Sequence, residues 1–207
     1  MAGVEGHPYS WRGALNRDGS WALVADGVGG HIAGEVASTL AVEILRPLMR
    51  GLKTAAEIQA AVRTADEGVF LAMQMRPELT GMGTTLVGAL LRPKETLLFN
   101  VGDSRAYAIE DGKLRQVTRD QSFKSGALLQ CIGGFQEPSP LYVPVMSVSP
   151  RAQILLCSDG LTDMVSDDEI VRVLRAHPEN PAGVLVDLAL ASGGHDNVSA
   201  IVLSPPS

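Results

Sequence analysis

Residues 84–118 constrain the fold more than any other stretch, because short apolar runs follow one another there with only tight turns between them. The runs read TTLVGALL, ETLLFNVG, SRAYAIEDG and KLRQVT, and the turns contain RPK, GD and DG. Short runs of this texture, split by Gly-Asp and Asp-Gly turns, are typical of strands joined by hairpins. We therefore predict an antiparallel meander in this stretch.

Helices are predicted before and after this meander. Residues 20–25 have the texture of a strand, and residues 33–50 carry apolar side chains at helical spacing up to Pro47. A second helix is predicted over residues 55–75, which are rich in alanine and place an apolar residue at every third or fourth position.

The last third of the chain repeats this alternation of strand and helix. A loop rich in proline is followed by the strand AQILLCS, by helices around residues 166–176 and 181–191, and by a last strand, VSAIVL. Helices in pairs and strands in runs favour an α+β layered domain over alternating βαβ units. The chain has 207 residues with 45% hydrophobic content, so we expect residues 1–207 to form a single domain with a sizeable core.

Composition excludes several classes of function. The formal charge of −6, without a cluster of lysine and arginine, argues against nucleic acid as a partner. No long apolar run and no leader-like N-terminus occur, so neither a membrane span nor export is predicted. Cys157, one of two cysteines, lies in the apolar run ILLCSDG and is expected to be a buried thiol in the reducing cytoplasm. We expect a cytoplasmic monomer.

The glycine-rich stretch VADGVGGHIAGEVAS, residues 24–38, leads from the first strand into the first helix. It lacks the lysine of a P-loop, and Asp26 lies inside the loop, where it would repel a bound phosphate. Two readings remain at this point: a simple Asp-Gly turn, or a site for a cation.

Four aspartates favour the cation. Each stands where an apolar run meets a turn and has a glycine within two positions: Asp26, Asp103, Asp159 and Asp196. Strand ends of antiparallel sheets can share one edge, and ionised carboxylates gathered there repel one another unless protons or a cation neutralise them. All-oxygen ligands suit Mg²⁺ or Mn²⁺. His31 and His195 stand near two of these aspartates and are expected to be solvated or hydrogen-bonded rather than ligands.

The order of the motifs resembles the metal-dependent protein phosphatase 2C (PPM) family. These motifs are VADGVGGHIAGEVAS, GMGTTLVGALL, FNVGDSRAYAI, VTRDQSF, LLCSDGLTDMVSDDEI and GGHDNVSAIVL. The resemblance covers residues 20–204 and implies an αββα sandwich of two antiparallel sheets flanked by pairs of helices.

The resemblance also implies a metal centre. Asp26 matches the carboxylate that bridges two metals, Gly27 lends a backbone carbonyl, and Asp159 and Asp196 complete the set. Asp103, with Asp159 and Asp163, resembles a third-metal site. Further positions match family motifs, and capping or packing explains each of them equally well: Glu35, Thr84, Thr85, Ser104 and Asn197.

The activity implied by the resemblance is hydrolysis of phosphoserine or phosphothreonine by a water that bridges two Mn²⁺ or Mg²⁺ ions, without a phosphoenzyme. Asp26, Asp159 and Asp196 would be the catalytic residues. No motif offers a nucleophilic cysteine with an adjacent arginine, as a cysteine phosphatase requires. The expected partners are a phosphorylated protein substrate and an opposing serine/threonine kinase.

The sequence departs from the family in four places. The first strand with its phosphate-binding arginine and the Asn-(Glu/Gln)-Asp element are not recognisable, so we expect the chain to begin after them. Asp18 of NRDG fits a hairpin turn, and Arg12 is the first candidate to replace the missing arginine. The flap after VTRDQS is nearly absent, and Val28 stands where some relatives carry a histidine. Two alternatives therefore stay open: an impaired phosphatase-like binding module, and a sporulation-type phosphatase acting on a small regulatory phosphoprotein.

Overall fold

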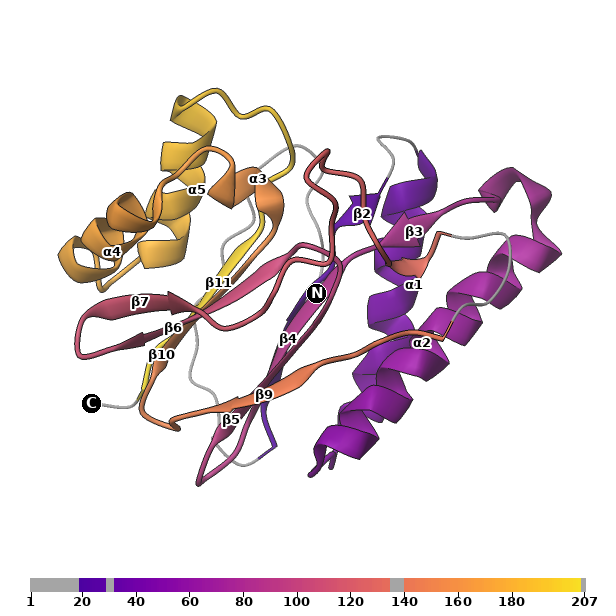
Figure 1. Ribbon diagram of the computed structural model, residues 1–207, viewed down its shortest axis with the longest axis horizontal. Helices are drawn as coiled ribbons and strands as arrows, with labels where there is room; N and C mark the ends of the chain where they lie inside the picture. The colour runs from indigo at the N-terminus through magenta and orange to yellow at the C-terminus, as the bar shows by residue number, and fades with distance from the viewer. Residues whose placement is uncertain (1–18, 29–31, 135–139, 206–207) are drawn as a thin grey trace.

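The computed structural model describes residues 19–28, 32–134 and 140–205 (Figure 1). Its elements, in chain order, are β1 (Trp21–Val24), β2 (Gly27–Val28), α1 (Ile32–Leu48), α2 (Ala55–Met75), the 3₁₀ turn η1 (Pro77–Leu79), β3 (Gly83–Thr84), β4 (Leu86–Leu91), β5 (Thr96–Val101), β6 (Arg105–Glu110), β7 (Lys113–Gln116), β8 (Ile132–Gly133), β9 (Val145–Val148), β10 (Gln153–Cys157), α3 (Asp159–Thr162), α4 (Asp167–Ala176), α5 (Pro181–Ala191) and β11 (Ala200–Leu203).

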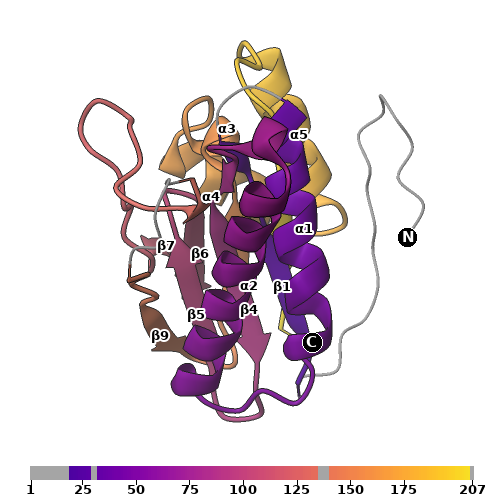
Figure 2. The ribbon, with the colours of Figure 1, turned by 90° about the vertical axis from the view of Figure 1, so that its right-hand side faces the viewer.

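Two four-stranded antiparallel sheets form the centre of the molecule. Their strand orders are β1-β4-β5-β9 and β11-β10-β6-β7. Helices α1 and α2 pack side by side on the outer face of the first sheet, and α3, α4 and α5 cover the outer face of the second (Figures 1 and 2). The predicted α+β class and its αββα layers are therefore confirmed.

Alternation along the strands explains these layers. On β4, Leu86 and Leu90 belong to the core under α1 and α2, while Val87 and Ala89 belong to the core between the two sheets. On β10, Leu155 faces the second helical layer, and its neighbours face the other sheet. Successive side chains of a strand point to opposite faces, so a run that is apolar at every position is suited to a sheet covered on both sides.

The meander predicted over residues 84–118 is only partly correct. Strands β4 and β5 pair in the first sheet, and β6 and β7 pair in the second, so the chain crosses between sheets after β5. The crossing uses Gly102, whose φ of 92° is in the left-handed region, and a Cβ there would lie 2.9 Å from Thr85 Cγ2. The Gly-Asp pair predicts a hairpin turn, but a hairpin turn and a crossing between sheets can have the same residues.

A third, smaller sheet was not predicted. Its order is β2-β3-β8, with Gly27 opposite Thr84 and Gly83 opposite Gly133. Strands of two residues are too short to show a period in the sequence. A Cβ on Gly27 would meet the backbone of Gly34 in α1, so the glycines of residues 24–38 allow β2 to approach the helix closely. Strand β9 was also missed, because it lies in the stretch predicted as a loop rich in proline.

The predicted helices are confirmed with small shifts at their ends. Helix α2 has the predicted bounds and begins with a capping box in which Thr54 Oγ1 accepts from Glu57 N, while Glu57 accepts from Thr54 N. Helix α4 begins in the same way at Ser166 and Glu169. None of the helices in the described part of the chain is long and apolar enough to cross a membrane.

Candidate metal centre

Three of the four aspartates stand two residues after the end of a strand. Asp26 follows β1, Asp103 follows β5, and Asp159 follows β10 as the first residue of α3. Strands β1 and β5 both pair antiparallel with β4, so they run in the same direction and end at the same edge. This is the upper edge in Figure 1, where β2 and α3 lie. Asp196 lies four residues before β11, which pairs antiparallel with β10.

The electrostatics of this edge show that the carboxyl groups are close together. Burial, followed by the charge of Asp159 and a side-chain hydrogen bond with it, raises the pKa of Asp26 to about 7, and Asp196 and Asp103 add to the rise. Burial and the charge of Asp159 raise the pKa of Asp103 to about 6. Desolvation and like charges both disfavour the ionised form, so the pair Asp26–Asp159 can be kept together by a shared proton or by a cation.

One carboxylate oxygen of Asp159 indicates whether the residues at this edge suit a cation. Its Oδ1 is buried and has no hydrogen-bond partner within the described residues. A buried carboxylate oxygen without a partner is energetically costly, and the carboxyl groups of Asp26 and Asp103 are close enough to interact with Asp159 through their charges. The donors are all oxygens, as hard divalent cations prefer. The residues at this edge therefore fit Mn²⁺ or Mg²⁺.

The structure brings only some of the predicted metal ligands together. Asp196 is exposed, and its Oδ1 accepts a hydrogen bond of 2.7 Å from the backbone N–H of Asn197. Asp163 is exposed at the end of α3, one turn after Asp159. Within the described ranges, no group of three or more His, Cys, Asp or Glu side chains is arranged to hold a metal ion. Asp26 and Asp159 interact directly, whereas Asp163 and Asp196 are exposed, and Asp196 acts on Asp26 through its charge.

Buried hydroxyl groups fix the backbone of Asp26. Thr84 Oγ1 donates to the carbonyl of Asp26 at 2.9 Å, and the N–H of Asp26 donates to Thr85 Oγ1 at 3.2 Å. Thr85 Oγ1 also lies 2.6 Å from Ser104 Oγ, next to Asp103. Thr84, Thr85 and Ser104 thus have structural contacts that join the strand ends carrying Asp26 and Asp103.

The hydroxyl group of Ser158 likewise fixes the backbone next to Asp159. Its Oγ donates to the carbonyl of Asn197 at 3.2 Å and accepts from the N–H of Ser199 at 3.1 Å, so the start of α3 is tied to the loop of Asp196. Glu35 and His195 are exposed. Asp18, Arg12 and His31 lie outside the described residues.

Two features near the site were not predicted. Arg105 forms a forked ion pair with Asp120, with its Nε 3.0 Å from Oδ1 and its Nη2 2.8 Å from Oδ2. Gln121 binds both backbone polar groups of Gly102. Neither contact has a signal in the sequence, because the partners belong to different segments and no local pattern relates them.

The cysteines are buried thiols, as expected for Cys157. Burial raises the pKa of Cys157 to about 12 and that of Cys131 to about 11. A nucleophilic cysteine needs its thiolate form, which is favoured by a lowered pKa. Both cysteines are therefore unsuited to cysteine phosphatase chemistry.

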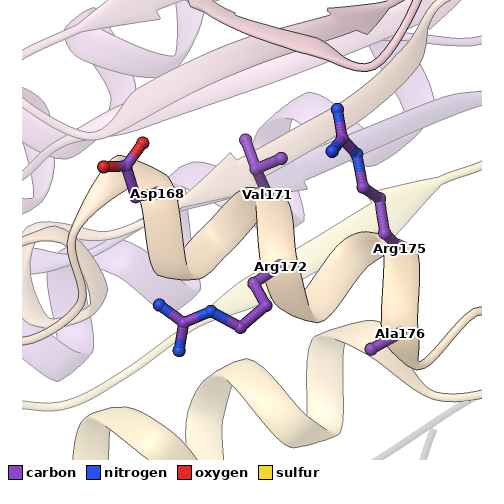
Figure 3. A pocket seen from close by; sticks show the side chains of 5 residues that line it. All are labelled: Asp168, Val171, Arg172, Arg175 and Ala176. Carbon is purple, nitrogen blue, oxygen red and sulfur yellow. The ribbon is translucent and has the colours of Figure 1, made fainter.

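A pocket on the outer side of α4 lies apart from the aspartates. Figure 3 shows its lining, which comes from that one helix: Asp168, Val171, Arg172, Arg175 and Ala176. It contains none of the predicted site residues, and one of its arginines, Arg175, donates to the carbonyl of Gly112. We assign the chemistry to the edge of the sheets rather than to this pocket.

Comparison with known proteins identifies the family. The model of the family described as protein phosphatase 2C matches residues 10–180. The chain belongs to the protein phosphatase 2C family. The predicted family is thus confirmed, and the motif order that indicated it extends over both sheets and both helical layers.

Two bacterial serine/threonine phosphatases are similar to this chain. The serine/threonine protein phosphatase PstP of Mycobacterium tuberculosis is 36% identical over 203 residues, which are 86% of this chain and 39% of PstP. The serine/threonine phosphatase stp of Listeria welshimeri is 33% identical over 211 residues, covering 87% of this chain and 82% of stp. The chain therefore spans about two fifths of the length of PstP.

A solved structure of the catalytic domain of PstP in complex with two manganese ions is similar to this chain. The TM-score is 0.76 at 33% identity, and the match covers 94% of each chain. The likeness extends across nearly the whole fold and agrees with the αββα layers found here.

Proposed function

We propose that this chain is a metal-dependent serine/threonine phosphoprotein phosphatase. The observation that carries the proposal is the pair Asp26–Asp159, whose carboxyl groups are partly buried and interact directly, an arrangement that a cation would stabilise. Neither forms an ion pair with a residue of the described ranges, unlike Asp120 with Arg105. Family membership and relatives named serine/threonine phosphatases support the same activity.

The proposed cofactor is Mn²⁺ or Mg²⁺, with two ions per site and a third at Asp103. Asp26, the Gly27 carbonyl, Asp159 and Asp196 would hold the two ions, and Asp103, Asp159 and Asp163 the third. When bound, divalent cations supply Lewis acidity and lower the pKa of a water that can attack phosphorus. The chain's own part is to hold Asp26 and Asp159 in place through the buried hydroxyl groups of Thr84, Thr85 and Ser158. Support for two ions comes from the manganese complex of the similar PstP domain.

The proposed substrate is a protein phosphorylated on serine or threonine, which implies an opposing serine/threonine kinase. We also propose that residues 1–207 act as one domain, as a monomer in the cytoplasm. The three cores that are stacked across the two sheets support the single domain, because neighbouring layers share strands.

The test is hydrolysis of a phosphothreonine peptide by the purified chain with Mn²⁺, Mg²⁺ or EDTA. We expect turnover with either ion and its loss in EDTA, restored when Mn²⁺ is added in excess. Full turnover in EDTA would contradict the proposal. Mn²⁺ binding without any turnover would instead support the impaired binding module.

A further inference from the structure

The segment after β7, residues 117–134, lies against the turn that carries Asp103. Asn100 Nδ2 donates both to the carbonyl of Gly102, at 3.2 Å, and to that of Arg119, at 3.1 Å. This fully buried side chain joins the end of β5 to the segment. The turn is therefore held by a segment that follows it in the chain after β6 and β7.

Gln121 forms the closest link between the segment and the turn. Its backbone N–H donates to the carbonyl of Gly102 at 3.0 Å, and its side-chain Oε1 accepts from the N–H of Gly102 at 2.7 Å. Both backbone polar groups of one glycine are thus bound by one residue. Gly102 has a φ of 92° and no side chain, so these two hydrogen bonds limit a residue that has unusual backbone freedom.

The side chain of Gln121 is itself held by a second glutamine. Gln130 Nε2 donates to Gln121 Oε1 at 2.8 Å and also lies 2.6 Å from the carbonyl of Tyr142. The N–H of Leu129 donates to the carbonyl of Gln121 at 2.7 Å. Gln121 Nε2 is buried without a hydrogen-bond partner in the described residues, so this side chain keeps its position at some energetic cost.

We propose that Gln121 is a positioning residue for Asp103. By binding both polar groups of Gly102, it fixes the direction in which the next residue presents its carboxyl group to Asp159. This inference rests on the proposed function, because it assumes that Asp103 takes part in binding a cation. Replacing a group that orients a metal ligand, without binding the metal itself, commonly lowers metal affinity or activity by about 10- to 100-fold.

The experiment compares Gln121→Met with Gln116→Met. Methionine has a similar length and lacks the acceptor that binds Gly102. Gln116 is a matched control, because its Nε2 donates to Asp120 at 2.8 Å in the same region without contacting Gly102. Asp103→Asn serves as the reference for loss of the Asp103 charge. Mn²⁺ binding is measured by titration calorimetry, and thermal unfolding is measured with and without EDTA.

We expect Gln121→Met to weaken the same Mn²⁺ binding step that Asp103→Asn weakens, by about 10-fold or more. Gln121→Met should retain the Mn²⁺ binding steps that do not depend on Asp103. Gln116→Met should bind Mn²⁺ like the wild type. Gln130→Met removes the hydrogen bond to Gln121 Oε1 together with the contacts between Gln130 and the backbone of Tyr142, and it should give an intermediate loss. It replaces Gln121→Met in the test if that variant does not fold.

Three results would overturn the inference. One is Mn²⁺ binding by Gln121→Met that equals that of Gln116→Met. Another is a lower melting temperature in EDTA with unchanged Mn²⁺ binding, which would show a purely structural role. The third is unchanged Mn²⁺ binding by Asp103→Asn. A wild-type chain that binds no Mn²⁺ would instead reject the proposed function itself.

Discussion

Asp159 and Asp120 are both partly buried aspartates, and they differ in what balances their charge. Asp120 accepts hydrogen bonds from Arg105 through both oxygens and a further one from Gln116. Asp159 has one buried oxygen without a partner, and its close neighbour is the carboxyl group of Asp26. The first arrangement is complete within the protein, whereas the second needs a positive charge from outside. Carboxyl groups whose charge is unbalanced in this way cluster at functional sites, which makes Asp159 a candidate functional residue.

The largest expected effect is a difference in turnover between variants of Asp159 and Asp120. Asp159→Asn keeps the size of the side chain and removes the charge that would hold the cations, so we expect at least about 100-fold lower turnover of a phosphothreonine peptide with Mn²⁺. Asp120→Asn should retain most of the turnover and instead lower stability, because Arg105 loses its partner. Wild-type turnover of Asp159→Asn would remove the distinction between the two sites.

The second prediction concerns stability without metal. Asp26→Asn removes one charge from the crowded edge, so in EDTA at pH 8 we expect a melting temperature a few degrees above that of the wild type, equivalent to about 1 kcal/mol. Excess Mn²⁺ should raise the melting temperature of the wild type and change that of the variant much less. Calorimetric scans with EDTA and with Mn²⁺ check both statements. A destabilised variant in EDTA would mean that repulsion is not what limits this edge.

A smaller effect is expected at the balanced pair. Arg105→Lys keeps the charge and loses the fork that binds both oxygens of Asp120. The side chains of this pair are 28% and 30% exposed, so solvent screens it and the loss should be about 1 kcal/mol or less in urea unfolding. Mn²⁺ binding should stay within about twofold of the wild type, well below the roughly 10-fold or larger loss expected when a group that orients a metal ligand is replaced. A larger change in Mn²⁺ binding would show that the two sites are coupled.

The smallest effect is expected at His195, which is exposed near Asp196. An imidazole has no favoured place among hard oxygen ligands, so His195→Ala should leave the Mn²⁺ dependence of turnover unchanged. A lost Mn²⁺ requirement, or one raised by about tenfold, would show that a nitrogen ligand takes part and that the all-oxygen site is wrong. Turnover measured over a range of Mn²⁺ concentrations decides between these outcomes.

The candidate site was predictable in part. Asp26, Asp103 and Asp159 could be found from sequence, because each follows an apolar run and stands beside a glycine. Their shared edge follows from the antiparallel pairing of β1 and β5 with β4. The sequence alone did not reveal that Asp196 binds its own loop or that Gln121 holds Gly102. These contacts depend on distances between segments that no local pattern encodes.

The sequence by itself determined the long elements, because a helical period is repeated along α2 and α4, and β4 and β10 are continuous apolar runs. It also determined the family through the order of its motifs. Only the tertiary structure decided that the chain changes sheets at Gly102 and that β2, β3 and β8 form a sheet of their own. A glycine turn allows either a hairpin or a crossing, and two residues carry no period, so packing between distant segments selects the outcome.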